Sequence, residues 1–336
     1  MGAVSDIVNI GDWTRMRQWA MAAGVAMIGF GILAYWGWID PSKTLYASNR
    51  WLWLSASVGG LMFGFGMVLA SGCGSKTLVR IGAGNLKSLV VFVVLGVAAF
   101  ATLKGITAVL RVATVDRAAL ELASGVGLVQ ILAAALGAKV QVIGLLLGLG
   151  LGGALLIWAL VGREFRTMDN LLAGFGIGAV VVLAWYLSGS YGHLAEHPET
   201  LQEAYLATNS GRAEALSFVA PIAYSLDWLM FFSDKSKVLT LGVVSVAGVI
   251  AGSAVVALSS GVFRWEGFGG TEDVANHLVG ASLMGVGGVT AMGCTVGQGL
   301  SGVSTLSATS FVAVCAIIAG AVAAFKYQEW RIDRAG

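Results

Sequence analysis

The chain has 336 residues, of which 57% are hydrophobic and 11% are charged, whereas a soluble domain contains about 45–50% apolar and about 25% charged residues. No water-soluble fold can bury so large an apolar share, so the composition excludes a soluble globular protein. The formal net charge of +2 gives no basic field for nucleic acid and no acidic tail. The basic residues therefore serve as markers of membrane topology.

The apolar stretches predict an all-α polytopic membrane protein of about eight or nine transmembrane helices with additional re-entrant or short helices. A helix needs about 20 apolar residues to cross a hydrocarbon core about 30 Å thick. The predicted spans are, in chain order, 18–38, 51–71, 88–110, 140–162, 169–188, 238–262, 273–292 and 303–325. The first apolar stretch is too long for a signal peptide, so we expect it to remain in the mature protein.

Two further apolar stretches carry polar interruptions. The first, 118–137, contains Glu121 and Gln130, and the second, 214–232, contains Pro221 and Asp227. Both are predicted to be re-entrant or interfacial helices, and the sequence leaves open whether either crosses the membrane.

Basic residues cluster at one side if the eight clear stretches cross. That side then holds both termini and is predicted to be cytoplasmic by the positive-inside rule. Its basic residues are Arg15, Arg17, Lys76, Arg80, Lys87, Arg163, Arg166, Arg264, Lys326, Arg331 and Arg334. The opposite side carries an acidic loop with Glu196, Glu199 and Glu203, although Lys235 and Lys237 also fall there.

An internal repeat is the most informative feature of the chain. Residues 64–73 read GFGMVLASGC and residues 285–294 read GVGGVTAMGC, 221 positions apart. The same offset superimposes three consecutive predicted helices, and five spans begin between the two starting points. An odd number inverts the second half, so we expect two inverted-topology halves, 18–137 and 214–326, joined by 138–213 within one transmembrane domain, 1–336. Inverted repeats place a binding site near the midplane, where the halves meet.

Each repeat ends in a glycine-rich break that contains a cysteine. Glycine permits the irregular backbone that a break at membrane depth requires, and the freed amide groups, with nearby polar side chains, can bind an anion. A helix starting after the break adds the positive end of its dipole. The thiol is soft and polarisable, which suits a sulfur-bearing anion. The candidate binding residues are Cys73 and Cys294 with Gly72, Gly74, Ser75, Thr77, Gly293, Thr295, Gly297, Gln298 and Gly299, and we expect the five glycines to form loop backbone.

The two breaks also carry a family resemblance. LASGCGSKTLVRIGAGNLKSL at 69–89 and AMGCTVGQGLSGVSTLS at 291–307 resemble the YeeE/YedE membrane family, associated with uptake of thiosulfate and related sulfur compounds. The resemblance implies a prokaryotic inner-membrane protein with a short constriction lined by Cys73 and Cys294. It also implies a small cytoplasmic TusA-like sulfur carrier as a partner. Family members can carry a further functional cysteine near the N-terminus, which this chain lacks.

Two classes of function remain from the sequence. The first is a permease that holds a sulfur anion, most simply thiosulfate, at the thiols. The second is a membrane sulfurtransferase that forms a cysteine persulfide. An activated thiolate needs a neighbouring base or a positive site. Cys73 has Lys76 close in sequence, but Cys294 has no ionisable neighbour between 278 and 325 other than Cys315, so the sequence favours transport.

Other candidate residues receive structural interpretations. Cys315 lies outside the repeat and is expected to be a buried packing residue. Lys104 is read as a charge inside a span, and His277 as an interfacial residue. The spacing of the cysteines and histidines predicts neither a metal site nor a cofactor. The substrate among sulfur anions, the coupled ion and the oligomeric state are left open.

Overall fold

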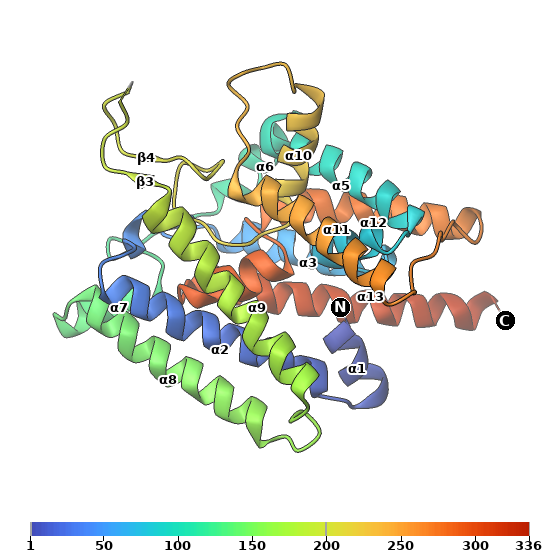
Figure 1. Cartoon of the computed structure of the whole chain (residues 1–336), viewed down its shortest axis with the longest axis horizontal. Helices are drawn as coiled ribbons and strands as arrows, with labels where there is room; N and C mark the ends of the chain where they lie inside the picture. Colours follow the sequence, from blue (N-terminus) through green and yellow to red (C-terminus); the bar gives the residue numbers. More distant parts are fainter. Residues whose placement is uncertain (1, 199, 336) are drawn as a thin grey trace.

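The computed structural model describes residues 2–198 and 200–335. Met1 and Gly336, at the ends of the predicted domain, and Glu199, in the acidic loop, lie outside the described residues. The helices are α1 (Gly2–Ile10), α2 (Thr14–Tyr35), α3 (Trp53–Leu69), α4 (Gly74–Gly82), α5 (Leu86–Lys104), α6 (Ile106–Ala113), α7 (Leu128–Leu136), α8 (Val140–Val161), α9 (Met168–Tyr186), α10 (Ala220–Met230), α11 (Leu241–Ser259), α12 (Thr271–Thr290) and α13 (Ala308–Ala335). Both termini lie toward the right of Figure 1, and α7 and the β3–β4 pair lie toward the left.

Short elements connect these helices. Two 3₁₀ turns occur at Pro41–Lys43 and Val115–Arg117, and two π-helical stretches at Leu187–Tyr191 and Gly297–Gly302. The strands are β1 (Arg50–Trp51), β2 (Leu120–Glu121), β3 (His193–Leu194) and β4 (Ala204–Tyr205). They form two antiparallel pairs, β1 with β2 and β3 with β4, so the fold is all-α with small ladders in its loops.

Seven helical stretches are long and apolar enough to cross a membrane, and they confirm seven of the eight predicted spans. They are Thr14–Tyr35, Trp53–Gly82, Leu86–Lys104, Val140–Val161, Met168–Tyr191, Leu241–Ser259 and Ala308–Arg334. The eighth prediction, 273–292, corresponds to α12, which has 20 residues. Its hydropathy is lower because Asp273, Asn276 and His277 lie in its first two turns.

The predicted span 88–110 was too long. Helix α5 ends at Lys104, Gly105 interrupts the chain, and α6 continues as a separate short helix. Lys104 therefore lies at a helix end, where its ammonium is 5.9 Å from the ring centroids of Phe100 and Tyr224. Lys104 is thus the last residue of the span Leu86–Lys104 and not an interior one.

The two interrupted stretches form short helices. Helix α7 has nine residues and α10 has eleven, which correspond to lengths of about 14 Å and about 17 Å at a rise of about 1.5 Å per residue. Neither can cross a hydrocarbon core by itself, in agreement with their interpretation as re-entrant or interfacial.

Helices α3 and α12, which the sequence repeat relates, pack against each other in opposite directions. Gly59 of α3 lies against Ala291, just past the end of α12, and Gly66 lies against Gly280 near its start. The neighbouring contacts repeat as well, because Gly64 of α3 lies against α13 and Gly285, 221 residues later, lies against α5. An antiparallel pairing of equivalent helices is the arrangement that inverted halves require.

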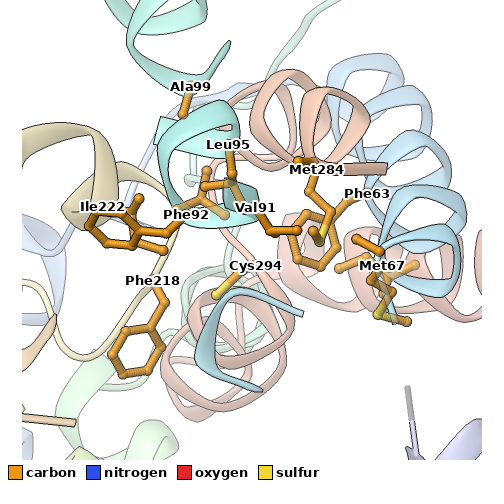
Figure 2. Close-up of a cluster of buried hydrophobic side chains, with 14 of the residues drawn as sticks. Phe63, Met67, Val91, Phe92, Leu95, Ala99, Phe218, Ile222, Met284 and Cys294 are labelled. Carbon is orange, nitrogen blue, oxygen red and sulfur yellow. The ribbon is translucent and has the colours of Figure 1, made fainter. Parts of the chain in front are cut away.

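The core around this crossing is apolar and tightly packed. Figure 2 shows Phe63 of α3, Leu95 of α5 and Met284 of α12 converging there, each almost completely buried. Within a bilayer, side chains of this size stabilise the fold through close packing rather than through removal from water. Cys294 belongs to the same cluster.

Candidate functional site

The two breaks have the same backbone structure. Each follows a long helix and closes with a hydrogen bond from an amide to the carbonyl five residues earlier, as in a Schellman cap. These bonds are Gly72 N to Met67 O and Gly293 N to Gly288 O, both 2.8 Å. The preceding residues, Ser71 and Met292, both adopt the left-handed region, with φ of 58° and 56°. The offset of 221 therefore holds for backbone geometry as well as for sequence.

Three of the five glycines do not form the loop backbone that the sequence predicted. Gly74 is the first residue of α4, and Gly297 and Gly299 lie in the second π-helical stretch. Close packing accounts for two of them, because a methyl group on Gly297 would meet the Ser217 hydroxyl and one on Gly299 would meet the Trp19 ring. The breaks are thus shorter than predicted, and a helix begins immediately after each cysteine.

Cys73 occupies the position before the first residue of α4. Its carbonyl accepts a hydrogen bond from the amide of Thr77 at 2.9 Å, and its thiol lies 3.3 Å from the hydroxyl of Ser75. The Lys76 amide, in the first turn of α4, and the Thr295 hydroxyl, in the other half, are further hydrogen-bond partners of this sulfur. The thiol thus faces the positive end of a helix.

Cys294 occupies the equivalent position in the second half. Its carbonyl accepts a hydrogen bond from the amide of Gln298 at 2.8 Å, which is equivalent to the bond from the Thr77 amide to the Cys73 carbonyl. The amide of Gly297 donates to its sulfur at 3.4 Å, and the Ser217 hydroxyl lies 4.0 Å away. The side chain is fully buried, and in Figure 2 it lies beside Phe218 and the α5 cluster.

The structure brings the two thiols together. Thr295, the neighbour of Cys294 in the chain, contacts the sulfur of Cys73, and the two sulfurs are close enough for their charges to interact. Cys73 packs against the buried cluster that contains Cys294. Two helix N-termini, one from each half, therefore meet at a pair of thiols.

Thr77 and Gln298 use their side chains to brace the breaks. The Thr77 hydroxyl donates to the carbonyl of Cys73 at 3.1 Å, and the Gln298 amide donates to the carbonyl of Ala291 at 2.5 Å. Their donors are therefore occupied within the protein. The Gln298 Oε1 atom is buried and has no hydrogen-bond partner among the described residues.

A cavity of about 200 Å³ reaches the second break from the face opposite the termini. Ser217, Met292 and Gly293 border its inner part, and Glu214 and Tyr224 form part of its wall. Tyr46 also lines it, with its hydroxyl donating to the carbonyl of Gly297 at 2.6 Å. A larger cavity of about 410 Å³ shares Tyr46 but borders Ser304–Ser307 rather than either thiol.

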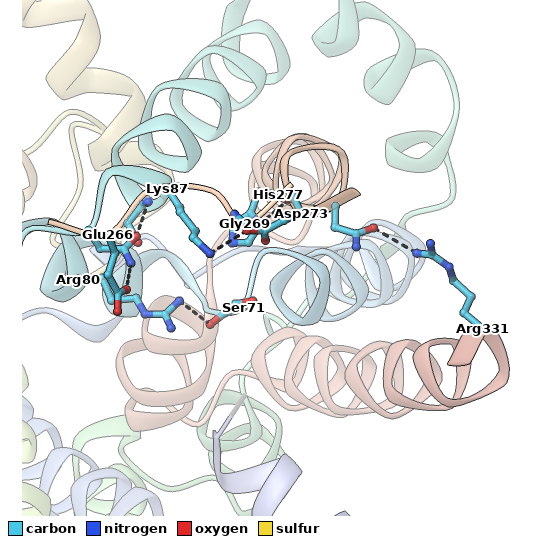
Figure 3. A network of polar contacts seen from close by, with 11 residues as sticks. Ser71, Arg80, Lys87, Glu266, Gly269, Asp273, His277 and Arg331 are labelled. Atoms are coloured by element: carbon cyan, nitrogen blue, oxygen red, sulfur yellow. Dashed lines mark hydrogen bonds and ion pairs between the residues drawn. The ribbon is translucent and has the colours of Figure 1, made fainter. Parts of the chain in front are cut away.

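The first break faces the opposite way, toward the side that holds the termini. Arg80 donates to the carbonyl of Ser71 at 3.2 Å, and Figure 3 shows this contact within a polar network. In that network Lys87 forms an ion pair with Asp273 at 2.7 Å, while His277 contacts the Asp273 carboxylate at 3.0 Å. Arg80 and His277 thus have structural partners at a helix end.

Cys315 differs from its predicted environment. The side chain is exposed on α13 and points away from the packed core, so the expectation of a buried packing residue is wrong. In a bilayer, such a position on a spanning helix faces lipid or a neighbouring molecule.

Sequence analysis did not identify Ser217, Tyr46 or Glu214 as site residues. Ser217 lies 77 residues before Cys294, and Tyr46 lies 251 residues before Gly297. None of the three belongs to the ten-residue pattern at 64–73 and 285–294, so that pattern does not mark them.

Comparison with known proteins gives consistent matches. Residues 1–323 match the model of a family described as sulphur transport. The thiosulfate transporter TsuA of Escherichia coli strain K12 is 24% identical over 294 residues, which cover 84% of this chain and 76% of that protein. The thiosulfate transporter TsuA of Spirochaeta thermophila is 25% identical over 282 residues, which cover 78% of this chain and 74% of that protein.

Proposed function

The chain belongs to the sulphur transport family, and on that premise we propose that it imports thiosulfate through a constriction formed by Cys73 and Cys294. The observation that carries the proposal is the meeting of two cysteine-capped helix N-termini at the centre of the bundle. The two relatives named as thiosulfate transporters support the choice of substrate.

The constriction attracts anions mainly through helix ends and neutral donors, although Lys76 in the first turn of α4 is near enough for its charge to act on the Cys73 sulfur. Each helix N-terminus carries about half an elementary positive charge, and the donors available are the two thiols, the hydroxyls of Ser75 and Thr295, and the Gly297 amide. An anion must leave as readily as it enters, which requires several weak contacts rather than one deep well. Neutral donors at helix ends meet that requirement better than an arginine would.

The surroundings of the thiols favour thiosulfate over a harder oxyanion. Phe218, Val289 and Val296 place apolar surface beside Cys294, and burial in an apolar environment costs most for strongly hydrated ions. The terminal sulfur of thiosulfate is large, soft and weakly hydrated. It can sit among thiol groups and apolar side chains while its oxygens face the amide and hydroxyl donors.

Transport accounts for the site better than covalent sulfur transfer. The hydrogen-bond partners found for the two thiols in residues 2–198 and 200–335 are hydroxyl and amide groups. A sulfurtransferase would need a base or a positive site to generate the attacking thiolate. Cys73 has the Lys76 ammonium nearby, whereas the contacts of Cys294 are the Ser217 hydroxyl and the Gly297 amide. The thiolate would attack the terminal sulfur of thiosulfate, form a persulfide and release sulfite.

Uptake of ³⁵S-thiosulfate into proteoliposomes tests the function, with Cys73→Ala, Cys294→Ala and Cys315→Ala compared at equal reconstitution. We expect uptake to fall at least about tenfold in the first two variants, the effect of losing about 1.4 kcal/mol of stabilisation, and to remain at the parental level in the third. Absence of uptake by the parent protein would refute the proposal. Persulfide on Cys73 or Cys294, detected by mass spectrometry with release of sulfite, would instead favour sulfur transfer.

Two finer assignments belong to the same proposal. We place the protein in the plasma membrane of a prokaryote, with the termini in the cytoplasm and a TusA-like sulfur carrier receiving the product there. Growth on thiosulfate as sole sulfur source should then require such a carrier in the cell, whereas uptake into proteoliposomes should not. Equal growth with and without the carrier would refute this partner.

A further inference from the structure

We propose that Glu214 takes up a proton as the anion enters the cavity leading to Cys294, so that substrate binding is coupled to protonation of this carboxyl group. The inference rests on the proposed function and adds a coupled ion to it. Glu214 lies outside the ten-residue pattern that ends in each cysteine, and it forms hydrogen bonds with Ser188 and Ser210.

The position of Glu214 carries the argument. Its segment lies between α9 and α10, and its backbone amide donates a hydrogen bond to the Ser188 hydroxyl at 3.2 Å. The carboxylate accepts a hydrogen bond from the Ser210 hydroxyl at 2.9 Å. Glu214 lines the cavity of about 200 Å³ together with Ser217 and Gly293. An anion that reaches Cys294 through this cavity passes the carboxyl group.

The neighbouring cations are engaged by other groups. Three of them form ion pairs: Arg111 on α6 with Asp116 at 3.1 Å, Lys43 in the α2–α3 loop with Glu203 at 2.7 Å, and Lys237 after α10 with Asp227 at 2.5 Å. The Lys104 ammonium lies 5.9 Å from the centroid of the Tyr224 ring. Arg212 donates a hydrogen bond to the Ala47 carbonyl at 2.7 Å. The other titratable groups facing the cavity region are the Tyr46 and Tyr224 hydroxyls and the Cys294 thiol. The carboxyl group therefore lacks an ion-pair partner among the described residues.

Because the Glu214 carboxyl group is enclosed by protein and has no cation beside it in the part of the chain that the structure describes, its pKa is raised. Burial raises the pKa of Glu214 to about 7, and the hydrogen bond from Ser210 offsets part of that effect. The residue as a whole is partly buried, because one side of the carboxyl group faces the cavity while protein surrounds the others. Protons can therefore reach it under physiological conditions.

A dianion in the cavity favours the protonated form of Glu214. Two negative charges at short distance in a partly enclosed site repel each other strongly, whereas a neutral carboxyl group can donate a hydrogen bond to an anion oxygen. Binding then takes up a proton. By linkage, affinity is full below the pKa of the free site, near 7, and falls as the pH rises above it, with a limit of about tenfold per pH unit for one proton.

The test is the pH profile of ³⁵S-thiosulfate affinity for the parent, Glu214→Gln and Glu203→Gln in proteoliposomes between pH 6 and pH 8.5. Glutamine mimics the protonated form, so Glu214→Gln should keep its affinity at high pH and lose the pH dependence. Glu203, which is outside the cavity and paired with Lys43, serves as the matched control, and its variant should follow the parent. A parental pH profile in Glu214→Gln would overturn the inference while leaving the transport function intact.

A second measurement needs no variant. Thiosulfate is fully ionised at neutral pH, so any proton taken up on binding must go to the protein. Adding thiosulfate to the purified parent in weak buffer near pH 7 should raise the pH of the solution, as read by an indicator dye. Thiosulfate binding without proton uptake overturns the coupling, and absence of both binding and transport at every pH overturns the proposed function and this inference with it.

Discussion

Ser71 and Met292 occupy a backbone region that costs residues other than glycine about 1–2 kcal/mol. Both lie in the turn before a motif cysteine, with φ near +57° in each case, and the Arg80 guanidinium holds the Ser71 carbonyl. The cost is retained at equivalent positions of both halves. It is the kind of local strain that persists where surrounding contacts fix the geometry of a functional site.

Substitution at Ser71 tests this strain. Glycine adopts a left-handed backbone freely, so Ser71→Gly should unfold in detergent at a temperature equal to or above that of the parent. A β-branched residue fits that region poorly, so Ser71→Val should lose about 1–2 kcal/mol of stability and unfold at a lower temperature. Equal unfolding temperatures for the glycine and valine variants would contradict the strained geometry.

At the residue scale, sequence and structure agree where the repeat marks a position. Cys73 and Cys294 could be identified because each ends the same ten-residue pattern. The glycines were expected to supply the irregular backbone, yet the left-handed conformation falls on Ser71 and Met292, because the amides of Gly72 and Gly293 close the caps of α3 and α12. Ser217 could not be predicted, since it lies 77 residues before Cys294, outside the ten-residue pattern, and approaches the thiol only in the folded chain.

At the scale of helices, glycines determine how closely the two halves approach. Gly64 of α3 lies against the backbone of Ile317 and Ala321 on α13, where a methyl group has no room. Small residues at such crossings let helix backbones come into contact, which replaces the hydrophobic driving force that is absent within lipid. Packing at this crossing therefore positions the breaks that follow α3 and α12.

The variant Gly64→Ala should disturb this crossing. Overpacking a tight interface costs about 1–3 kcal/mol, so we expect a lower unfolding temperature in detergent and reduced thiosulfate uptake. Gly150→Ala in α8 is the matched control, because a methyl group there meets nothing within 4 Å, and alanine is a better helix former than glycine by about 1 kcal/mol. A Gly64→Ala protein as stable as the Gly150→Ala protein would contradict the close approach.

Element prediction succeeded for long apolar helices and failed at their ends. Seven spans follow from length and hydropathy alone. The helix expected after the first break, which is α4, was predicted without bounds and with Gly74 in the loop, because glycine, serine and threonine in GSKTLVRIG disfavour a helix by local propensity. Its contacts with α11 and α5 override that preference. Glycine is a poor helix former, and Gly105 ends α5 beside Lys104, although the apolar stretch 88–110 continues past it.

The topology of the whole molecule, with both termini on one side of the membrane, requires an even number of membrane crossings. Helix α12 is less apolar than the seven clear spans, yet it packs antiparallel to α3 along its length and begins beside the start of α5, where Lys87 pairs with Asp273. Eight crossings place both termini on one face, with the α10–α11 connection on the other. Seven crossings would separate the termini and make the relation between the halves inconsistent with inversion.

Thiol labelling distinguishes the two topologies. In a background with all three cysteines replaced, Asn9→Cys and Arg334→Cys report the two terminal segments, and Ser233→Cys reports the α10–α11 connection; Asn9, Arg334 and Ser233 are exposed. With eight crossings, a membrane-impermeant maleimide should label Ser233→Cys in intact cells and label the two terminal positions only after permeabilisation. Labelling of Arg334→Cys but not Asn9→Cys in intact cells would mean that α12 does not cross. Helix α12 would then enter and leave on one face, and the two cysteine-capped helices could not approach each other from opposite sides of the membrane.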